Sequence, residues 1–409
     1  MKAKKVELTP IYKSAVGLDV HQAKITACAI VEQKDGTHEV IFKEFGGFKK
    51  DRKLLAQWLS TLHPEVVVME STGIYWKSPF AALEKVGIVA LVVNARHVKQ
   101  VPGRKTDIND AQWLALLARS GLLNGSFIPP TILRTARLIS RQRQKLVGIL
   151  SAEKNRLHKI LTDGGIRLSV VISDINGKSG RAMIEGLIEG KTTAELLQFA
   201  DRRLKASKEE ISDALQGELT PTHLFVLNEL MDHIKDLERR IKRFEDQLLD
   251  ELADYKPAIE LLQTLPGIDI IAAAMLIVEI GDDMDAFKSA NHLASWTGLC
   301  PGNNESAGKR KSGKIRKGNP WIRRILCECA HAAKRTECMF KKKYQALVIR
   351  RGTKRSLIAI AHKLLKTIFA MLKTGECYRD SSIDYEELSV KRNAPRWIVK
   401  LKQFGYMPA

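Results

Sequence analysis

Four acidic residues in the first third of the chain have the types and spacing of a metal-binding site. Asp19 lies midway along an apolar segment typical of a strand, where an ionised carboxylate needs a partner. Glu70 closes a second apolar segment at its C-terminal end, the edge where open α/β sheets build their sites. Asp107 and Asp110 are three apart at the start of a predicted helix, so their side chains share one face. We expect the four carboxylates to converge.

Such a group offers oxygen ligands only, which suits Mg²⁺ or Mn²⁺. Two such ions, roughly 3.5 to 4 Å apart, would clamp the attacking and leaving oxygens of a phosphodiester. Arg104 and Lys105, shortly before Asp107, would then lie beside the scissile phosphate. The pattern predicts hydrolysis or transesterification of a nucleic acid.

Two of these acids also have an ordinary structural explanation. Asp107 could cap its helix, and Asp110 could be a surface charge in the first turn, where acids are favoured. Neither explanation covers an acid inside a strand, Asp19, together with one at a strand end, Glu70. The combination favours metal binding.

The charge of the chain indicates a polyanionic partner. Lys and Arg number 67 against 46 Asp and Glu, which gives a net charge of +21. Residues 305–373 hold 20 basic side chains and only three acids. A loop at 306–317, with glycines at 308 and 313, and the helix after it carry the basic residues that we expect to contact phosphates, namely Lys309, Arg310, Lys311, Lys314, Arg316, Lys317, Arg323 and Arg324.

Two sequence features that are missing predict the cellular compartment of the protein. No apolar run reaches the length of a membrane span, and the N-terminus leads into no signal-peptide core. The six cysteines form no Cys-x-x-Cys pair, so ordinary reduced thiols are expected. We expect a soluble protein in the cytoplasm.

The elements that must position the acids follow the order of an RNase H-like α/β fold. Residues 15–30 predict two alternating strands around a polar turn, and 40–45 a third. A helix near 54–62, a buried strand at 65–69, a helix near 75–86, a strand at 88–93 and a helix from about 108 to 122 follow. This domain is expected to span residues 1–128.

A helical connector and a mainly α C-terminal domain are expected after Pro129 and Pro130, over residues 129–256 and 257–377, with an irregular basic tail at 378–409. The connector begins with a basic helix at about 132–161. A second helix has apolar residues at spacings of three and four, the seam of a coiled coil, at Leu227, Leu230, Ile234, Leu237, Ile241, Phe244 and Leu248. This seam could pair with the first helix or with another subunit.

Two features of the C-terminal domain predict local structure. Leu265-Pro-Gly-Ile resembles the hairpin of a helix-hairpin-helix module, whose amides receive a DNA phosphate, but Asp269 stands where a glycine is usual, so a plain structural hairpin is equally open. Asn319 and Pro320 predict a helix start. Trp296 and Trp321 could stack on bases, although core packing is favoured.

Several motifs together resemble the DEDD transposases of IS110-type (IS110/IS1111) insertion sequences, whose N-terminal domain is similar to the RuvC resolvase. They are Gly17-Leu-Asp-Val-His, Glu70-Ser-Thr-Gly-Ile-Tyr, Asn94, Gly103-Arg-Lys-Thr-Asp-Ile-Asn-Asp-Ala-Gln, Leu265-Pro-Gly-Ile, Phe287-Lys-Ser-Ala, Gly298-Leu-Cys-Pro and Lys317-Gly-Asn.

The resemblance implies a DNA recombinase in a bacterial or archaeal cytoplasm, associated with the nucleoid. It implies a RuvC-like (RNase H fold) domain, a coiled-coil connector and a C-terminal transposase domain with a nucleophilic serine that matches Ser306. Family members usually show Ser-Gly where this chain has Ser306-Ala-Gly, so Ser312 is the competitor. The resemblance also implies a structured bridge RNA, element-end and target DNA as partners, and a homodimer or tetramer.

Two other functions fit the same residues. A RuvC-like structure-specific endonuclease would use water in place of Ser306. A non-catalytic nucleic-acid-binding protein would keep the fold without chemistry, although all four carboxylates are present.

Overall fold

The computed structural model describes residues 10–95, 98, 109–301, 304–306, 309–312, 315, 317–380 and 385–408. The chain divides into two compact units, 1–128 and 129–409, and each is described by itself. No helix in the described ranges is long and apolar enough to span a membrane.

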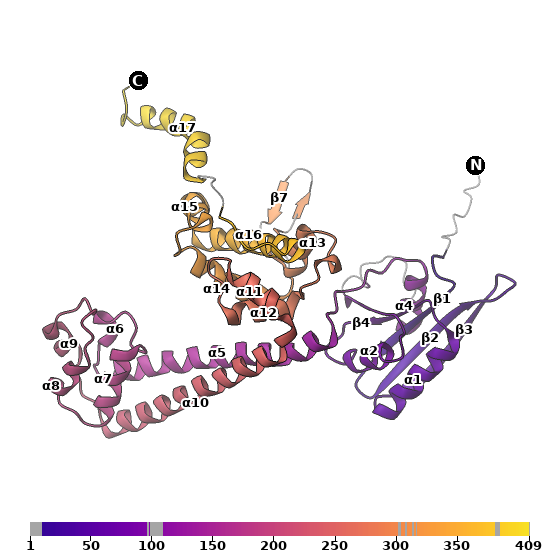
Figure 1. Ribbon diagram of the computed structural model, residues 1–409, viewed down its shortest axis with the longest axis horizontal. Helices are drawn as coiled ribbons and strands as arrows, with labels where there is room; N and C mark the ends of the chain where they lie inside the picture. The colour runs from indigo at the N-terminus through magenta and orange to yellow at the C-terminus, as the bar shows by residue number, and fades with distance from the viewer. Residues whose placement is uncertain are drawn as a thin grey trace. The chain divides into compact units, whose positions relative to one another are not determined.

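The N-terminal unit is built on a five-stranded sheet in the order β3-β2-β1-β4-β5 (Figure 1). Strands β1 to β3 form an antiparallel meander, and β4 and β5 run parallel to β1. The strands are β1 (Ser14–Val20), β2 (Lys24–Glu32), β3 (His38–Gly46), β4 (Val66–Glu70) and β5 (Ala90–Val93). This topology confirms the RNase H-like prediction.

Alternation along the strands gives the sheet two buried faces. Val16, Leu18 and Met69 point to the face that helices α1 (Lys49–Leu62) and α2 (Lys77–Glu84) cover. Ala15 and Val68 point to the opposite face, where α4 (Asp110–Arg119) packs. The central strands β1 and β4 must therefore be apolar on both faces, and each carries its acid near its C-terminal end, at the edge of the sheet.

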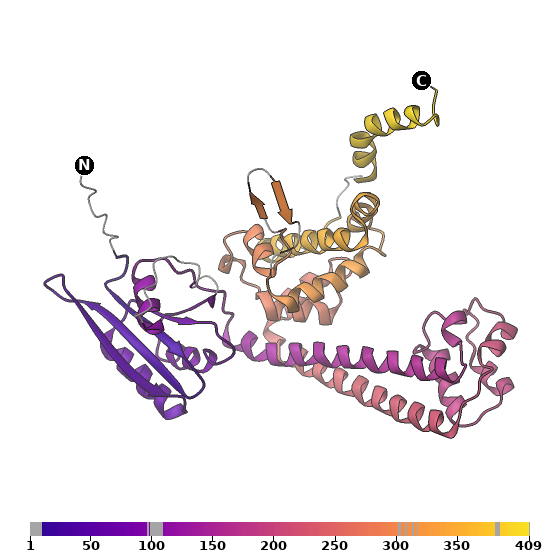
Figure 2. The same ribbon diagram turned by 180° about the vertical axis from the view of Figure 1, so that it is seen from behind.

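Two long antiparallel helices, α5 (Thr131–Asp163) and α10 (Pro221–Glu251), begin the second unit and lie side by side in both views (Figures 1 and 2). Five of the seven predicted seam residues are buried, and Leu230 and Phe244 are half-buried. In this chain the seam faces α5. Of the two partners that the sequence left open, the structure contains the intramolecular one.

Short helices close the far end of this hairpin around a common apolar core. They are α6 (Leu168–Val171), α7 (Lys178–Ile188), α8 (Thr193–Leu196), η1 (Leu197–Phe199) and α9 (Lys208–Ala214).

The C-terminal part of the second unit packs mainly around α12 (Ile270–Ile280) and α16 (Thr353–Thr374), each of which supplies more buried side chains than any other helix there. The other elements are η2 (Ala253–Tyr255), α11 (Lys256–Gln263), η3 (Met284–Ala286), α13 (Ala290–Thr297), β6 (Asn304–Ser306), β7 (Lys309–Ser312), α14 (Pro320–Ala333) and α15 (Met339–Arg351). All six cysteines are free, as expected.

The expectation of an irregular tail over 378–409 was wrong. Residues Tyr385–Gln403 form α17, a basic helix that accommodates Pro395 in its interior. A proline in a helix interior removes one backbone hydrogen bond and clashes with the preceding turn, so it bends a helix without necessarily ending it.

Candidate active site

Asp19 and Glu70 lie next to each other at the C-terminal ends of two neighbouring parallel strands. Leu18 of β1 is in register with Met69 of β4, so the next residue of each strand is one of the two acids. Adjacent strands lie about 4.8 Å apart, so the two carboxylates start side by side. The sequence placed Asp19 midway along its strand, whereas it is the penultimate residue of β1. The correction moves Asp19 to the edge where Glu70 also lies.

Both acids point to the sheet face that α4 covers. Asp19 is two residues beyond Gly17, and Glu70 is two beyond Val68, so each pair shares a face. A Cβ on Gly17 would lie 2.0 Å from the carbonyl oxygen of Ala111 in α4. The glycine therefore lets the helix backbone approach β1 directly below Asp19.

Helix α4 brings Asp110 to the same edge. The carbonyl of Arg119, at the end of the helix, accepts hydrogen bonds from residues that precede β1, so α4 runs antiparallel to β1. Its first residue, Asp110, therefore lies toward the C-terminal end of β1. The N-cap is Asn109, whose side chain accepts the Ala111 amide at 2.9 Å. The sequence analysis missed this capping role.

The acidic side chains have local partners. His21 Nε2 lies 3.1 Å from Asp19 Oδ2, and the Thr72 hydroxyl donates to Glu70 Oε1 at 2.7 Å. The Asp19 side chain is 28% exposed, which leaves it open to solvent-borne ions. Within the described residues, no group of three or more His, Cys, Asp or Glu side chains is arranged to hold a metal. The backbone brings three carboxylates to one edge, and rotation of their side chains is needed to make them converge.

Part of the predicted site lies outside the described residues. Asp107, Arg104 and Lys105 belong to that part. Asp19, Glu70 and Asp110 supply an all-oxygen donor set that fits a hard divalent cation.

Ser306 and Ser312, the two candidate nucleophiles, lie in one small antiparallel strand pair. Ser306 of β6 is in register with Lys309 of β7, and Ser312 is in register with Asn304. The loop predicted over 306–317 is therefore partly a hairpin. Strand β7 includes Lys309, Arg310 and Lys311, whereas Lys314 and Arg316 are outside the described residues.

The helix after this strand pair begins as predicted. Asn319 caps α14 by accepting the Trp321 amide at 3.0 Å, and Pro320 is the first helical residue. Lys317 is exposed, Arg323 is half-buried, and exposed Arg324 pairs with Glu328. Lys317 therefore precedes α14, and Arg323 and Arg324 lie in its first turns.

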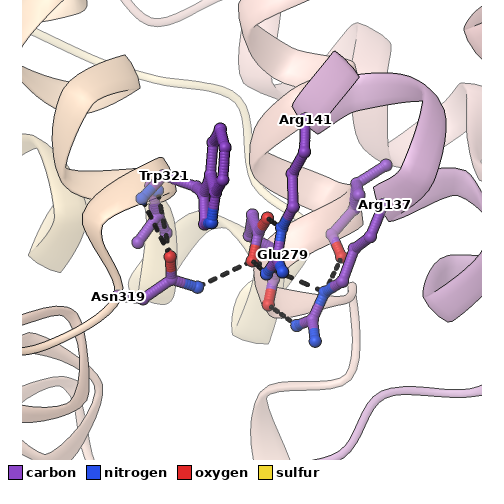
Figure 3. Close-up of polar contacts among 7 residues, drawn as sticks. Arg137, Arg141, Glu279, Asn319 and Trp321 are labelled. Carbon is purple, nitrogen blue, oxygen red and sulfur yellow. Dashed lines mark hydrogen bonds and ion pairs between the residues drawn. The ribbon is translucent and has the colours of Figure 1, made fainter. Parts of the chain in front are cut away.

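A buried carboxylate that the sequence analysis did not identify connects this helix start to α5 (Figure 3). Glu279 of α12 has a fully buried side chain. Arg141 donates two hydrogen bonds to it, at 2.9 and 3.0 Å, and the Asn319 side-chain amide donates a third at 2.6 Å. Arg137 donates to the Glu279 carbonyl at 2.7 Å. In the sequence, Glu279 is the one charged residue of an otherwise apolar helix, and this pattern could have indicated a buried carboxylate.

The arginines of α5 are consequently engaged within the protein. The guanidinium of Arg141 also stacks over Trp321, 5.3 Å from the ring centroid, and Arg143 pairs with Glu245 of α10 at 2.6 Å. Burial lowers the pKa of Arg137 to about 10, partly offset by Glu279. Trp296 contacts Phe287 edge-on. Both tryptophans therefore contribute to packing.

The hairpin at Leu265-Pro-Gly-Ile has a structural role here. Gly267 has a φ of +87°, and a Cβ on it would meet the backbone of α14 at 2.6 Å. Asp269 caps α12 by accepting the Ala272 amide at 2.7 Å. A carboxylate therefore takes the position where a DNA phosphate would bind, which favours the plain hairpin.

An exposed basic cluster lies at the junction of α15 and α16. Arg350, Arg351, Lys354 and Arg355 are exposed, and no ion pair joins them to an acid within the described ranges. Such side chains attract backbone phosphates without reading sequence.

Two segments of the chain match models of transposase families. Residues 16–165 match the model of a transposase family of DEDD, IS110 type, and residues 259–345 match the Transposase IS116/IS110/IS902 family. A probable family 20 transposase of Pseudomonas aeruginosa is 26% identical over 338 residues, covering 80% of this chain and 90% of that protein. The transposase of insertion sequence element IS1111A from Coxiella burnetii is also 26% identical, covering 79% and 83%.

A structural likeness was found to RuvC of Thermus thermophilus. The match covers 28% of this chain and 99% of that one, with 13% sequence identity and a TM-score of 0.22.

Proposed function

Because this chain belongs to the IS110 family of transposases, we propose that it cuts and rejoins insertion-sequence DNA by metal-assisted phosphoryl transfer from a serine. The observation that carries this proposal is the juxtaposition of Asp19 and Glu70 at neighbouring strand ends, on the face where α4 begins. We expect the enzyme to act in the cytoplasm.

Asp19, Glu70, Asp107 and Asp110 would hold divalent cations, Mg²⁺ in the first instance. Bound there, two such ions would neutralise the charge that develops on the attacking and leaving oxygens of the phosphodiester. Asp19 and Glu70 would be ligands from the sheet, and Asp110 from the helix start. His21, beside Asp19, would orient that carboxylate by a hydrogen bond.

Ser306 would be the nucleophile. Its Oγ would bond to the DNA phosphorus as the bond to the 3′-oxygen breaks, which leaves a 5′-phosphoserine and a free 3′-hydroxyl. Its register partner is Lys309, and the sequence of β7 continues with Arg310 and Lys311, so positive charge near the serine would stabilise the developing phosphate charge. Family resemblance further suggests that the acids of one subunit act with the serine of another.

A structured bridge RNA is the second proposed nucleic-acid partner. The supporting observation is the charge of residues 305–373 and the exposed cluster of Arg350, Arg351, Lys354 and Arg355. These contacts recognise backbone, so base pairing by the RNA would supply sequence choice.

A suicide substrate tests the serine. It is an element-end duplex nicked just beyond the cleavage site, supplied with RNA transcribed from the flank of the element and with Mg²⁺. Wild type and Ser312→Ala should form a covalent adduct on a denaturing gel, with the modified peptide spanning Ser306, and Ser306→Ala should form none.

The other outcomes discriminate between the alternatives. A Ser306→Ala variant that cuts at the normal rate without an adduct would identify a water-using endonuclease of the RuvC kind. An adduct that Ser306→Ala keeps and Ser312→Ala loses would transfer the role to Ser312. No cleavage by the wild type would favour a binding protein.

A further inference from the structure

We propose that the outer edge of β3 pairs with β3 of a second copy of this chain, antiparallel and symmetric about Ile41. Strand β3 is nine residues long and lies at the end of the sheet order. One edge pairs with β2, and no described strand pairs with the other. A long unpaired edge is a template for another strand.

The strand carries exposed apolar side chains. Val40 is 43% exposed and Phe42 is 51% exposed. Their register partners in β2, Ile30 and Cys28, are buried beneath α4. The apolar face of the sheet therefore continues past the helix onto β3, where a second sheet would extend it.

The main-chain hydrogen bonds fix which residues can pair outward. The Gln33 amide donates to the Thr37 carbonyl at 2.8 Å, and the Gly47 amide donates to the Ala23 carbonyl at 2.8 Å. Antiparallel hydrogen-bonded pairs alternate along a ladder, so odd-numbered residues of β3 turn their main chain toward β2. The amides and carbonyls of Val40 and Phe42 consequently face outward.

Charge selects one register among those that this alternation allows. With the two-fold axis at Ile41, Glu39 lies opposite Lys43 twice, and Val40 lies opposite Phe42. His38 then lies opposite Glu44. An axis at Glu39 or Lys43 would place like charges directly opposite each other, which destabilises a strand pair. An axis at Val40 or Phe42, which the alternation also allows, would form no pair of opposite charges, so the axis at Ile41 is favoured by its two Glu39–Lys43 pairs.

The present contacts of these charged residues do not prevent the pairing. Glu39 accepts from Gln33, and the Lys43 ammonium lies 5.4 Å from the Phe45 ring centroid. Both charged residues are exposed, and contacts at exposed sites are weak. A pair of nine-residue strands is a small interface, so we expect a weak dimer that is best detected by trapping.

Cysteine trapping in the full-length chain tests the register. In a Cys377→Ser background, which removes an exposed native thiol, Ile41→Cys places two thiols opposite each other at a non-hydrogen-bonded pair, about 4.5 Å apart at Cα. Phe42→Cys is the control, because its copies lie diagonally, roughly 7 to 8 Å apart and beyond disulfide reach. With oxidised glutathione, Ile41→Cys should give a dimer linked 41 to 41, at least tenfold faster than Phe42→Cys.

A charge swap provides the second arm. In the Ile41→Cys chain, Lys43→Glu should slow crosslinking about tenfold, and adding Glu39→Lys should restore it, since opposite charges again face each other. The double variant also lacks the Lys43 contact with Phe45, so restoration excludes a mere folding defect. Equal rates for Ile41→Cys and Phe42→Cys, absence of a crosslink, or no restoration would overturn the proposal. It is independent of the proposed chemistry.

Discussion

Gly17 sets the distance between β1 and α4, and with it the position of Asp110. Replacement by alanine would put a Cβ 2.0 Å from the Ala111 carbonyl, an atom of helix backbone that cannot turn aside. We expect Gly17→Ala to lower the free energy of unfolding by about 1 to 3 kcal/mol and to impair DNA cleavage.

Thermal unfolding and a cleavage assay measure these effects. Gly148→Ala in α5 is the control, because a Cβ there meets nothing within 4 Å and alanine favours the helix. Unchanged stability and cleavage in Gly17→Ala would show that the close approach is unimportant.

Glu279 is the second residue on which the structure depends. Its removal in Glu279→Ala would leave Arg141 and the Asn319 amide without their common acceptor, and Arg137 without its ion-pair partner. Breaking a buried ion pair costs about 3 to 5 kcal/mol, and urea unfolding should register a loss of that order. Glu279→Gln should cost less, since it keeps an oxygen acceptor.

The matched control is Glu328→Ala, whose exposed pair with Arg324 contributes little. A loss below about 1 kcal/mol for Glu279→Ala would contradict a role for this carboxylate in joining α5, α12 and α14.

At the scale of elements, periodicity predicted which faces are buried but not what they contact. The apolar segments around Asp19 and before Glu70 predicted strands correctly, because β1 and β4 are buried on both faces. The seam from Leu227 to Leu248 was predicted as buried, yet its partner, α5, begins 90 residues before α10 and no local pattern identifies it. The strands β6 and β7 were missed because their charged sequence resembles a loop.

The connector contains a pH-sensitive contact between elements. Glu238 of α10 accepts two hydrogen bonds from Arg181 of α7 and pairs with Lys154 of α5. The hydrogen bonds from Arg181 lower the pKa of Glu238 to about 2, and the hydrogen bond from Lys154 makes a smaller contribution in the same direction. Because its folded pKa is depressed, the stabilisation is complete above the unfolded value near 4.5 and is lost as the pH falls toward 2.

In Glu238→Gln, the free energy of unfolding should therefore change less between pH 5 and about 2 than in the wild type. Unfolding is measured by the loss of the helical circular dichroism signal. Glu229→Gln, an exposed position on the same helix, should keep the wild-type dependence. Identical slopes for Glu238→Gln and wild type would show that this network does not couple to stability.

For the whole molecule, the sequence identifies candidate site residues more readily than it predicts the contacts that they make. Carboxylates inside or at the end of apolar strands are conspicuous, since burial makes an unpaired charge costly, so Asp19 and Glu70 could be identified directly. The roles of Asn109 and Glu279 depend on contacts made only in the folded chain. The role proposed for Ser306 depends on the family resemblance alone, because serine is an ordinary residue in a basic segment.

Strand cleavage by Asp19→Asn and Glu70→Gln measures whether the acids at the sheet edge support metal-dependent catalysis. With element-end DNA and Mg²⁺, each variant should lose cleavage by about 100-fold or more while keeping its DNA affinity, because the acids act on the transition state and the cationic surfaces remain. Asp35→Asn, in an exposed turn, should cleave normally. Cleavage by Asp19→Asn and Glu70→Gln at the wild-type rate, or a wild-type rate that does not respond to removal of Mg²⁺ with EDTA, would contradict the account.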